Sequence, residues 1–338
     1  MSGTTSEAKP RGLDGVVAAQ TRMSHVDGQN GVLIIGGYEL KELAGKVTFE
    51  EASHLLWKGR LPSKEEKDEL TRAIASQRAL PETTLEIVRE AAKKGAPPID
   101  TLRMACATLS LDLRNPNDIS PGADFDNAKM LVARFPTIVA AHTRFAAGLE
   151  PIAPRTDLSL AGNFLYMVFG KEPDPIAAKA LDTYWVTVID HGMNASTFAG
   201  RVIASTRSDM VSAVTGAIGA LKGPLHGGAP GPVLDMLLEI KTLDNAEPWV
   251  RYELTAGRRI MGFGHRVYKV RDPRAEVLST VAEEMGGAVL HDKQLFDLAR
   301  EVERTVLRVL DDVKPGRNLK TNVEIGRASC RERVYSSV

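Results

Sequence analysis

The stretch that decides the fold is "TFEEASHLLWKGRLPSKEEKDEL", residues 48–70. Thr48 is followed three residues later by Glu51, and Ser63 is followed three residues later by Glu66. This spacing is typical of a capping box, in which the two side chains bind each other's backbone N–H groups at a helix start. Apolar residues after Thr48 recur on one helical face as far as Gly59. The stretch therefore predicts two consecutive helices joined by a short link.

Helical periodicity continues along most of the chain on the C-terminal side of this stretch. Pro81 begins a third helical pattern, and later patterns cover 98–112, 127–148, 160–170, 175–192, 194–206, 209–223, 231–240, 248–257, 272–287 and 292–313. On the N-terminal side, "GVLIIGGYEL" (31–40) is a short apolar run that predicts a small strand or hairpin. The predicted fold class is therefore all-α, with many helices of moderate length packed against each other.

Composition limits the protein classes to consider. The length of 338 residues indicates about two domains. Lys and Arg together number 43, as do Asp and Glu, so no basic excess favours a nucleic-acid or membrane-surface partner. The 2 cysteines cannot form a disulfide framework or a paired-cysteine metal site. No apolar run is long enough for a membrane span, and the polar N-terminus lacks a signal core, so we expect a cytoplasmic protein.

Three histidines lie beside glycines: His191 in "DHGMNASTF", His226 in "GPLHGGAPG" and His265 in "GFGHRVYKVRDPRA". Glycines let backbone N–H groups approach a ligand closely, and the helix start after His226 disfavours a protonated imidazole. A neutral His226 could donate a hydrogen bond to a developing oxyanion, and the basic residues near His265 suit a phosphate or carboxylate. The histidines could instead belong to a helix cap at Gly192, a plain turn and a solvated loop. Their separations match no metal-ligand motif.

The segments "GPLHGGAPGPVLDML", "IMGFGHRVYKVRDPRA", "DHGMNASTF" and "TNVE" occur in the order and spacing found in citrate synthases. Over residues 12–324 the chain resembles the compact prokaryotic branch of that family. The resemblance implies a two-domain helical homodimer with a small N-terminal hairpin and an active site in the cleft between the domains. It assigns residues 1–227 to a large helical domain and 228–324 to a small mobile domain.

The resemblance also implies a reaction, in which acetyl-CoA condenses with oxaloacetate and water to give citrate and CoA. His226 would bind the thioester oxygen, His265 would polarise the ketone of oxaloacetate, and Glu324 would be the base. His191 and Arg274 would hold the substrate carboxylates. The remaining contacts would be to CoA, from the backbone of Met261, Gly262, Phe263 and Gly264 and from the side chains of Lys269 and Arg317. No metal or cofactor is implied, because the CoA thioester is a substrate.

Two departures from the family pattern qualify these expectations. Residues 325–338 resemble the translation of a sequencing adapter, so we expect a non-native tail, and position 324 could natively be Asp. The family's last helices would then be missing, and we expect this chain as written to be weakly active or inactive, and poorly dimeric. The "APGP" after His226 leaves open a 2-methylcitrate synthase or a citryl-CoA lyase-like enzyme. A non-catalytic helical binding or scaffold protein is the alternative from a different class.

Overall fold

A computed structural model describes residues 16–224, 226–227, 231–263, 268, 270–286, 293–313 and 320–322. In chain order, the first helices in these ranges are α1 (Leu40–Leu43), α2 (Phe49–Lys58), α3 (Lys64–Ala75), α4 (Glu82–Lys93), α5 (Pro98–Thr108), η1 (Leu109–Asp112, a 3-10 helix), α6 (Pro121–Ala146) and α7 (Leu160–Phe169). The later helices are α8 (Pro175–Thr187), α9 (Ala195–Ser205), α10 (Met210–Leu221), α11 (Gly231–Ile240), α12 (Leu243–Thr255), α13 (Pro273–Gly286) and α14 (Lys293–Val313). The predicted all-α fold class is confirmed.

The expected hairpin is a three-stranded antiparallel sheet in the order β1-β2-β3. Strand β2 (Val32–Ile35) pairs with β1 (Ser24–Asp27) on one side and with β3 (Tyr38–Glu39) on the other. Sequence analysis found β2 and β3 but not β1, because the sequence "SHVD" has no clear alternation of apolar and polar residues.

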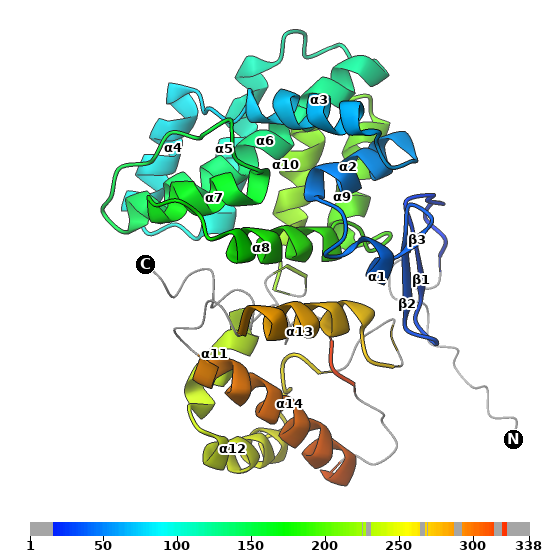
Figure 1. Cartoon of the computed structure of the whole chain (residues 1–338), viewed down its shortest axis with the longest axis vertical. Coiled ribbons are helices and arrows are strands. Elements are labelled where there is room, and N and C mark those ends of the chain that lie inside the picture. Colours follow the sequence, from blue (N-terminus) through cyan, green and yellow to red (C-terminus); the bar gives the residue numbers. More distant parts are fainter. Residues whose placement is uncertain are drawn as a thin grey trace, which may run out of the picture.

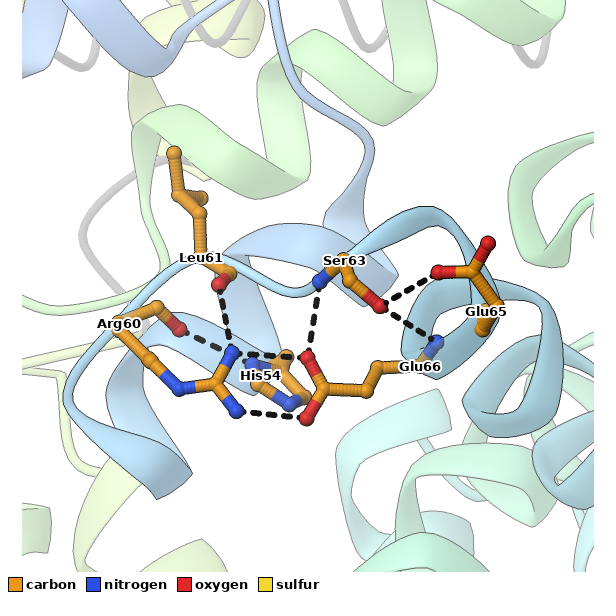
Figure 2. A network of polar contacts seen from close by, with 6 residues as sticks. All are labelled: His54, Arg60, Leu61, Ser63, Glu65 and Glu66. Atoms are coloured by element: carbon orange, nitrogen blue, oxygen red, sulfur yellow. Dashed lines mark hydrogen bonds and ion pairs between the residues drawn. The ribbon is translucent and has the colours of Figure 1, made fainter.

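Both predicted capping boxes are present. Thr48 and Ser63 each accept the backbone N–H of the glutamate three residues later, and that glutamate binds the capping residue's N–H. Gly59 ends α2 in the left-handed conformation, with φ of 79°. Figure 2 shows that the Glu66 carboxylate also accepts hydrogen bonds from Nη1 and Nη2 of Arg60, whose lengths are 2.7 and 2.6 Å. These bonds connect the cap of α3 to the residues that follow α2.

The helices form two packed groups, seen one above the other in Figure 1. In the larger group, α4, α5, α6 and α10 share one apolar core, and α9 packs along α10. In the smaller group, α11, α12 and α14 enclose a separate core. Helix α13 runs between the two and packs against α8 and α1. The domain boundary between residues 227 and 228 stays a prediction.

The end of α8 differs from the sequence-based expectation. The pattern over 175–192 predicted a helix capped by Gly192, but α8 ends at Thr187 and its C-cap residue is Val188. Gly192 does adopt the left-handed conformation, with φ of 72°. Its N–H, however, binds the Asp190 carboxylate at 3.0 Å, in a turn that lies beyond the helix. His191 is therefore in an irregular link between α8 and α9.

No helix in the described ranges combines the length and the apolar character needed to cross a bilayer.

Candidate active site

The link that carries His191 is held at both ends by short polar contacts. Asp190 accepts the N–H of Gly192, and the side chain of Asn194 caps α9 by accepting the N–H of Thr197 at 2.9 Å. Asn194 is a favourable N-cap because its side-chain oxygen replaces a hydrogen bond that the helix start lacks. These contacts place the half-buried His191 just before the first turn of α9, without touching its ring.

His226 meets that same first turn from the other side. Its Nε2 lies 2.6 Å from the Ser196 hydroxyl oxygen, which is also 2.9 Å from Asn194 Oδ1. The turn that carries His226 is tight, because the N–H of Gly227 binds the carbonyl of Leu221. A Cβ on residue 227 would lie 2.6 Å from that carbonyl oxygen, so only glycine fits. The glycine beside His226 thus lets the turn close.

The single hydroxyl proton of Ser196 allows two arrangements. In one, Ser196 donates to Asn194 Oδ1 and accepts the proton of His226 Nε2. In the other, Ser196 donates to Nε2, and a neutral His226 then carries its proton on Nδ1. Only the second arrangement leaves a neutral imidazole with a donor on the nitrogen away from Ser196.

Arg274 lies in a third segment, at the first turn of α13, and is paired with a buried carboxylate. Asp272 is fully buried and accepts Nη2 of Arg274 at 2.7 Å, Nε at 3.1 Å and the backbone N–H at 2.9 Å. Charged groups are rarely this buried unless they are paired. Because one carboxylate holds two nitrogens of the guanidinium, the plane of the Arg274 head group is fixed.

Tyr268 connects this segment to His191. Its side chain is almost fully buried, and its hydroxyl oxygen lies 3.1 Å from His191 Nε2, with the ring centroids 5.6 Å apart. Burial, reinforced by the nearby Asp272 carboxylate, raises the pKa of the Tyr268 hydroxyl above its ordinary value. The hydroxyl therefore stays protonated at neutral pH.

Two further contacts anchor the segment that runs from Tyr268 to Arg274. Gly31, in the turn between β1 and β2, has φ of 69°, and a Cβ there would lie 2.6 Å from a methyl group of Val270. The backbone N–H of Asp272 binds the carbonyl of Thr321 at 3.3 Å. The N-terminal sheet and the chain near residue 321 thus hold this segment from two directions.

The backbone predicted to contact CoA pairs with the same chain near residue 321. Phe263 forms a β-bridge with Thr321, and the carbonyl of Gly262 accepts the N–H of Asn322 at 3.0 Å. The side chains of Met261 and Phe263 pack against the core of α11, α12 and α14. The predicted role of Met261, Gly262 and Phe263 in binding CoA stays a prediction.

Several predicted site residues lie outside the described residues, namely Gly264, His265, Lys269, Arg317 and Glu324. Of the predicted residues that the structure describes, His191 and His226 flank the start of α9, and Arg274 lies six residues after Tyr268, which contacts His191. Within the described ranges, no group of three or more His, Cys, Asp or Glu residues could hold a metal ion. The expectation of a metal-free site stays a prediction.

Sequence reasoning missed Ser196, Tyr268 and Asp272. Ser196 is at the second position of the helix that starts just after His191, and Asp272 comes directly before the proline that starts α13. For both residues, the available signal was a polar side chain at a helix start, close in sequence to a predicted binding residue. Tyr268 gave only a weak signal, as an aromatic residue among basic neighbours.

A separate pocket of about 640 Å³ is lined by Pro273, next to Arg274, but by neither His191 nor His226. Its lining includes Lys41 and Lys46 near α1, Lys179 of α8, and Glu276 and Val277 of α13. None of the predicted site residues lines it. We place the candidate site at the histidines, where buried polar groups converge, because surface lysines alone do not define a catalytic centre.

Comparison with known proteins decides the family. A family model described as "Citrate synthase, C-terminal domain" matches residues 12–333. The chain belongs to the citrate synthase family. The match begins where the motif-based resemblance begins and extends past residue 324. The predicted enzyme class, an acyltransferase of the citrate synthase type, is confirmed in preference to the scaffold alternative.

Individual relatives support this family assignment. The chain is 40% identical to citrate synthase 2 of Bacillus subtilis, over 97% of this chain and 84% of the relative. It is 41% identical to a citrate/2-methylcitrate synthase of the same organism, over 87% of this chain and 78% of the relative. A solved citrate synthase of Thermoplasma acidophilum, in a ternary complex with carboxymethyl coenzyme A and oxaloacetate, matches with a TM-score of 0.86 and 27% identity. That match covers 96% of this chain and 85% of the other.

Proposed function

We propose that this enzyme condenses acetyl-CoA with oxaloacetate and water to give citrate and CoA, the first step of the tricarboxylic acid cycle. The observation that carries the proposal is that contacts between distant segments join His191 to Tyr268 and His226 to Ser196, with the buried Asp272–Arg274 pair a few residues beyond Tyr268. Family membership supports the same reaction class. The proposed division into domains at residue 227, the cytoplasmic location and the absence of a cofactor stay predictions.

Oxaloacetate carries two carboxylates, and we assign them to His191 and Arg274. The Asp272 carboxylate fixes the Arg274 guanidinium through Nε and Nη2, which leaves Nη1 to bind a substrate oxygen. Buried, pre-oriented donors bind an anion strongly because little reorganisation is needed when it arrives. These two residues therefore bind and orient the keto acid.

His226 would act on the thioester. In this step the Ser196 proton would turn from Asn194 Oδ1, which accepts it in the structure, to His226 Nε2, so that Nδ1–H donates to the thioester oxygen as the enolate forms. A methyl group beside a thioester is a weak acid, and its ionisation needs both a base and a stabilised oxygen. Glu324 and His265 would supply the base and the polarisation of the ketone.

A second candidate reaction uses propionyl-CoA and gives 2-methylcitrate. One relative, at 41% identity, is named citrate/2-methylcitrate synthase, and another, at 38% identity, is named 2-methylcitrate synthase. One additional methylene in an apolar pocket changes the specificity by only about 10- to 200-fold. The two reactions are therefore separated by a comparison of rates.

The test is thiol release from acetyl-CoA and from propionyl-CoA, each with oxaloacetate. It is run on this chain and on the chain extended with the C-terminal segment of a family member. We expect oxaloacetate-dependent thiol release with a higher kcat/KM for acetyl-CoA. A higher value for propionyl-CoA would favour the second reaction, and no thiol release from either protein would contradict both.

We also propose that two copies associate through α9. This helix has no buried residue, and Phe198 and Val202, one turn apart on the same face, are 38% and 48% exposed. An apolar helix face left open in a single chain is typical of a subunit interface.

In the chain extended with the C-terminal segment of a family member, a Phe198→Glu/Val202→Glu variant should therefore shift the protein toward monomer in light scattering at a fixed concentration. The matched control is Tyr252→Glu on α12, where an exposed apolar residue lies in the other helical group. An unchanged mass for the α9 variant, in a wild type that dimerises, would exclude this face.

A further inference from the structure

The His191 ring is in contact with a side chain from a distant segment, Tyr268. His191 lies beyond the end of α8 at Thr187 and before the cap of α9 at Asn194, so no helical hydrogen bonds fix its backbone. The hydrogen bonds of its neighbours Asp190 and Asn194 hold the backbone of the link and do not reach the His191 ring. The orientation of the imidazole therefore depends on the groups that touch the ring.

Tyr268 is suited to supply that contact. Its side chain is 3% exposed, so the ring has little freedom, and the residues after it are anchored by Gly31 and Thr321. The hydroxyl remains protonated and lies 3.1 Å from His191 Nε2. A buried, protonated phenol is a fixed donor whose position is set by the surrounding packing.

We propose that Tyr268 is the positioning residue of His191, with its hydroxyl donating to Nε2 so that the ring proton lies on Nδ1. In this tautomer, Nδ1–H is a donor that can bind a carboxylate of the keto acid. The role of this donor in oxaloacetate binding rests on the proposed function, whereas the tyrosine–histidine hydrogen bond does not.

The same bond joins the two predicted domains. His191 lies in the predicted large domain, 1–227, and Tyr268 lies in the predicted small domain, 228–324. Because Arg274 follows Tyr268 by only six residues, the bond also sets the two proposed carboxylate ligands relative to each other. Loss of the hydroxyl should thus weaken the binding of oxaloacetate more than that of acetyl-CoA.

The first test reads the bond without any substrate. Nitrogen-15 NMR of the imidazoles, with His191 assigned through a His191→Gln variant, reports which ring nitrogen carries the proton. We expect the Nδ1–H tautomer in the wild type and a shift toward Nε2–H in Tyr268→Phe, which keeps the ring. Unchanged His191 nitrogen shifts in Tyr268→Phe would overturn the proposal.

The second test is calorimetric titration with oxaloacetate. We expect Kd to rise about tenfold in Tyr268→Phe, as for one lost hydrogen bond to a buried acceptor. In a His191→Gln background the same change should have no further effect, which a general loss of packing would not reproduce. Tyr166→Phe on α7 is the matched control and should leave Kd unchanged.

The outcomes separate the two proposals. Oxaloacetate binding that is unchanged or tighter in Tyr268→Phe would mean that Tyr268 does not orient His191 for the ligand, and would overturn the positioning role. If the wild type binds no oxaloacetate while the NMR shows the expected change of tautomer, the proposed function fails and the tyrosine–histidine bond stands.

Discussion

His226 and His191 flank the first turn of α9, yet their partners come from different parts of the chain. His226 contacts Ser196, and both residues belong to the predicted large domain. His191 contacts Tyr268, which belongs to the predicted small domain. A domain movement would leave the first contact intact and would strain or break the second. The contact of His226 therefore lies within one predicted domain, whereas the orientation of His191 depends on how the two groups of helices are arranged.

The largest effect is expected from removing the buried Asp272 carboxylate, which pairs with Arg274 in the segment that carries Tyr268, the partner of His191. Asp272→Ala would leave the Arg274 guanidinium buried without its counterion, at a cost of about 3–5 kcal/mol of folding free energy. Urea unfolding should show this loss, and oxaloacetate binding should fall with it. The control Asp68→Ala, at an exposed position of α3, should stay within about 0.5 kcal/mol of wild type. A wild-type unfolding curve for Asp272→Ala would show that the ion pair contributes nothing.

An intermediate effect is expected at the Ser196–His226 contact, which lies within the predicted large domain. Ser196→Ala removes the hydroxyl that contacts His226 Nε2, so the imidazole loses the partner that can select its Nδ1–H tautomer. We expect kcat for thiol release to fall about 30-fold, or ~2 kcal/mol in activation free energy, with little change in KM for oxaloacetate. Ser205→Ala on the same helix is the control, since its hydroxyl binds only a carbonyl of its own helix. A rise in KM without a fall in kcat would place Ser196 in substrate binding instead.

A smaller, pH-dependent effect is expected in α8, the helix that leads to His191. Burial raises the pKa of Asp182 to about 7, against the opposing effect of the Phe49 N–H that it accepts at 3.0 Å. The folded protein therefore keeps a proton that the unfolded chain loses near pH 4, so this residue's contribution to stability falls as pH rises from about 4 to 7.

Asp182→Asn keeps an acceptor for Phe49 and cannot ionise. Relative to wild type, it should gain about 1 kcal/mol in unfolding free energy between pH 6 and pH 8, measured by urea unfolding. A difference between variant and wild type that does not change with pH would mean that Asp182 does not titrate in this range.

The sequence predicted the helical architecture because its signals are local. The capping boxes at Thr48 and Ser63 and the glycine at 59 involve residues close in the chain, and all three are where the pattern indicated. The error at Gly192 has the same origin. A glycine with positive φ after a helical pattern indicates a C-cap, but the Asp190 carboxylate takes its N–H in a separate turn.

The candidate site could be assembled from the sequence only in part, for a related reason, and the roles of its residues stay predictions. His191, His226 and Arg274 lie in local motifs rich in glycine or proline, so the sequence could single them out. Their partners could not be found in this way. Tyr268 meets His191 across 77 residues, and Ser196 meets His226 across 30, and no local pattern encodes such a contact. What the sequence lacked was therefore the second residue of each pair.

A crystal structure of the protein with oxaloacetate bound tests the proposed site most directly. We expect one carboxylate within hydrogen-bond distance of the His191 imidazole and the other against the Arg274 guanidinium, with Asp272 still paired to Nε and Nη2. Oxaloacetate bound instead in the lysine-rimmed pocket between α1, α8 and α13, with His191 and Arg274 untouched, would contradict it.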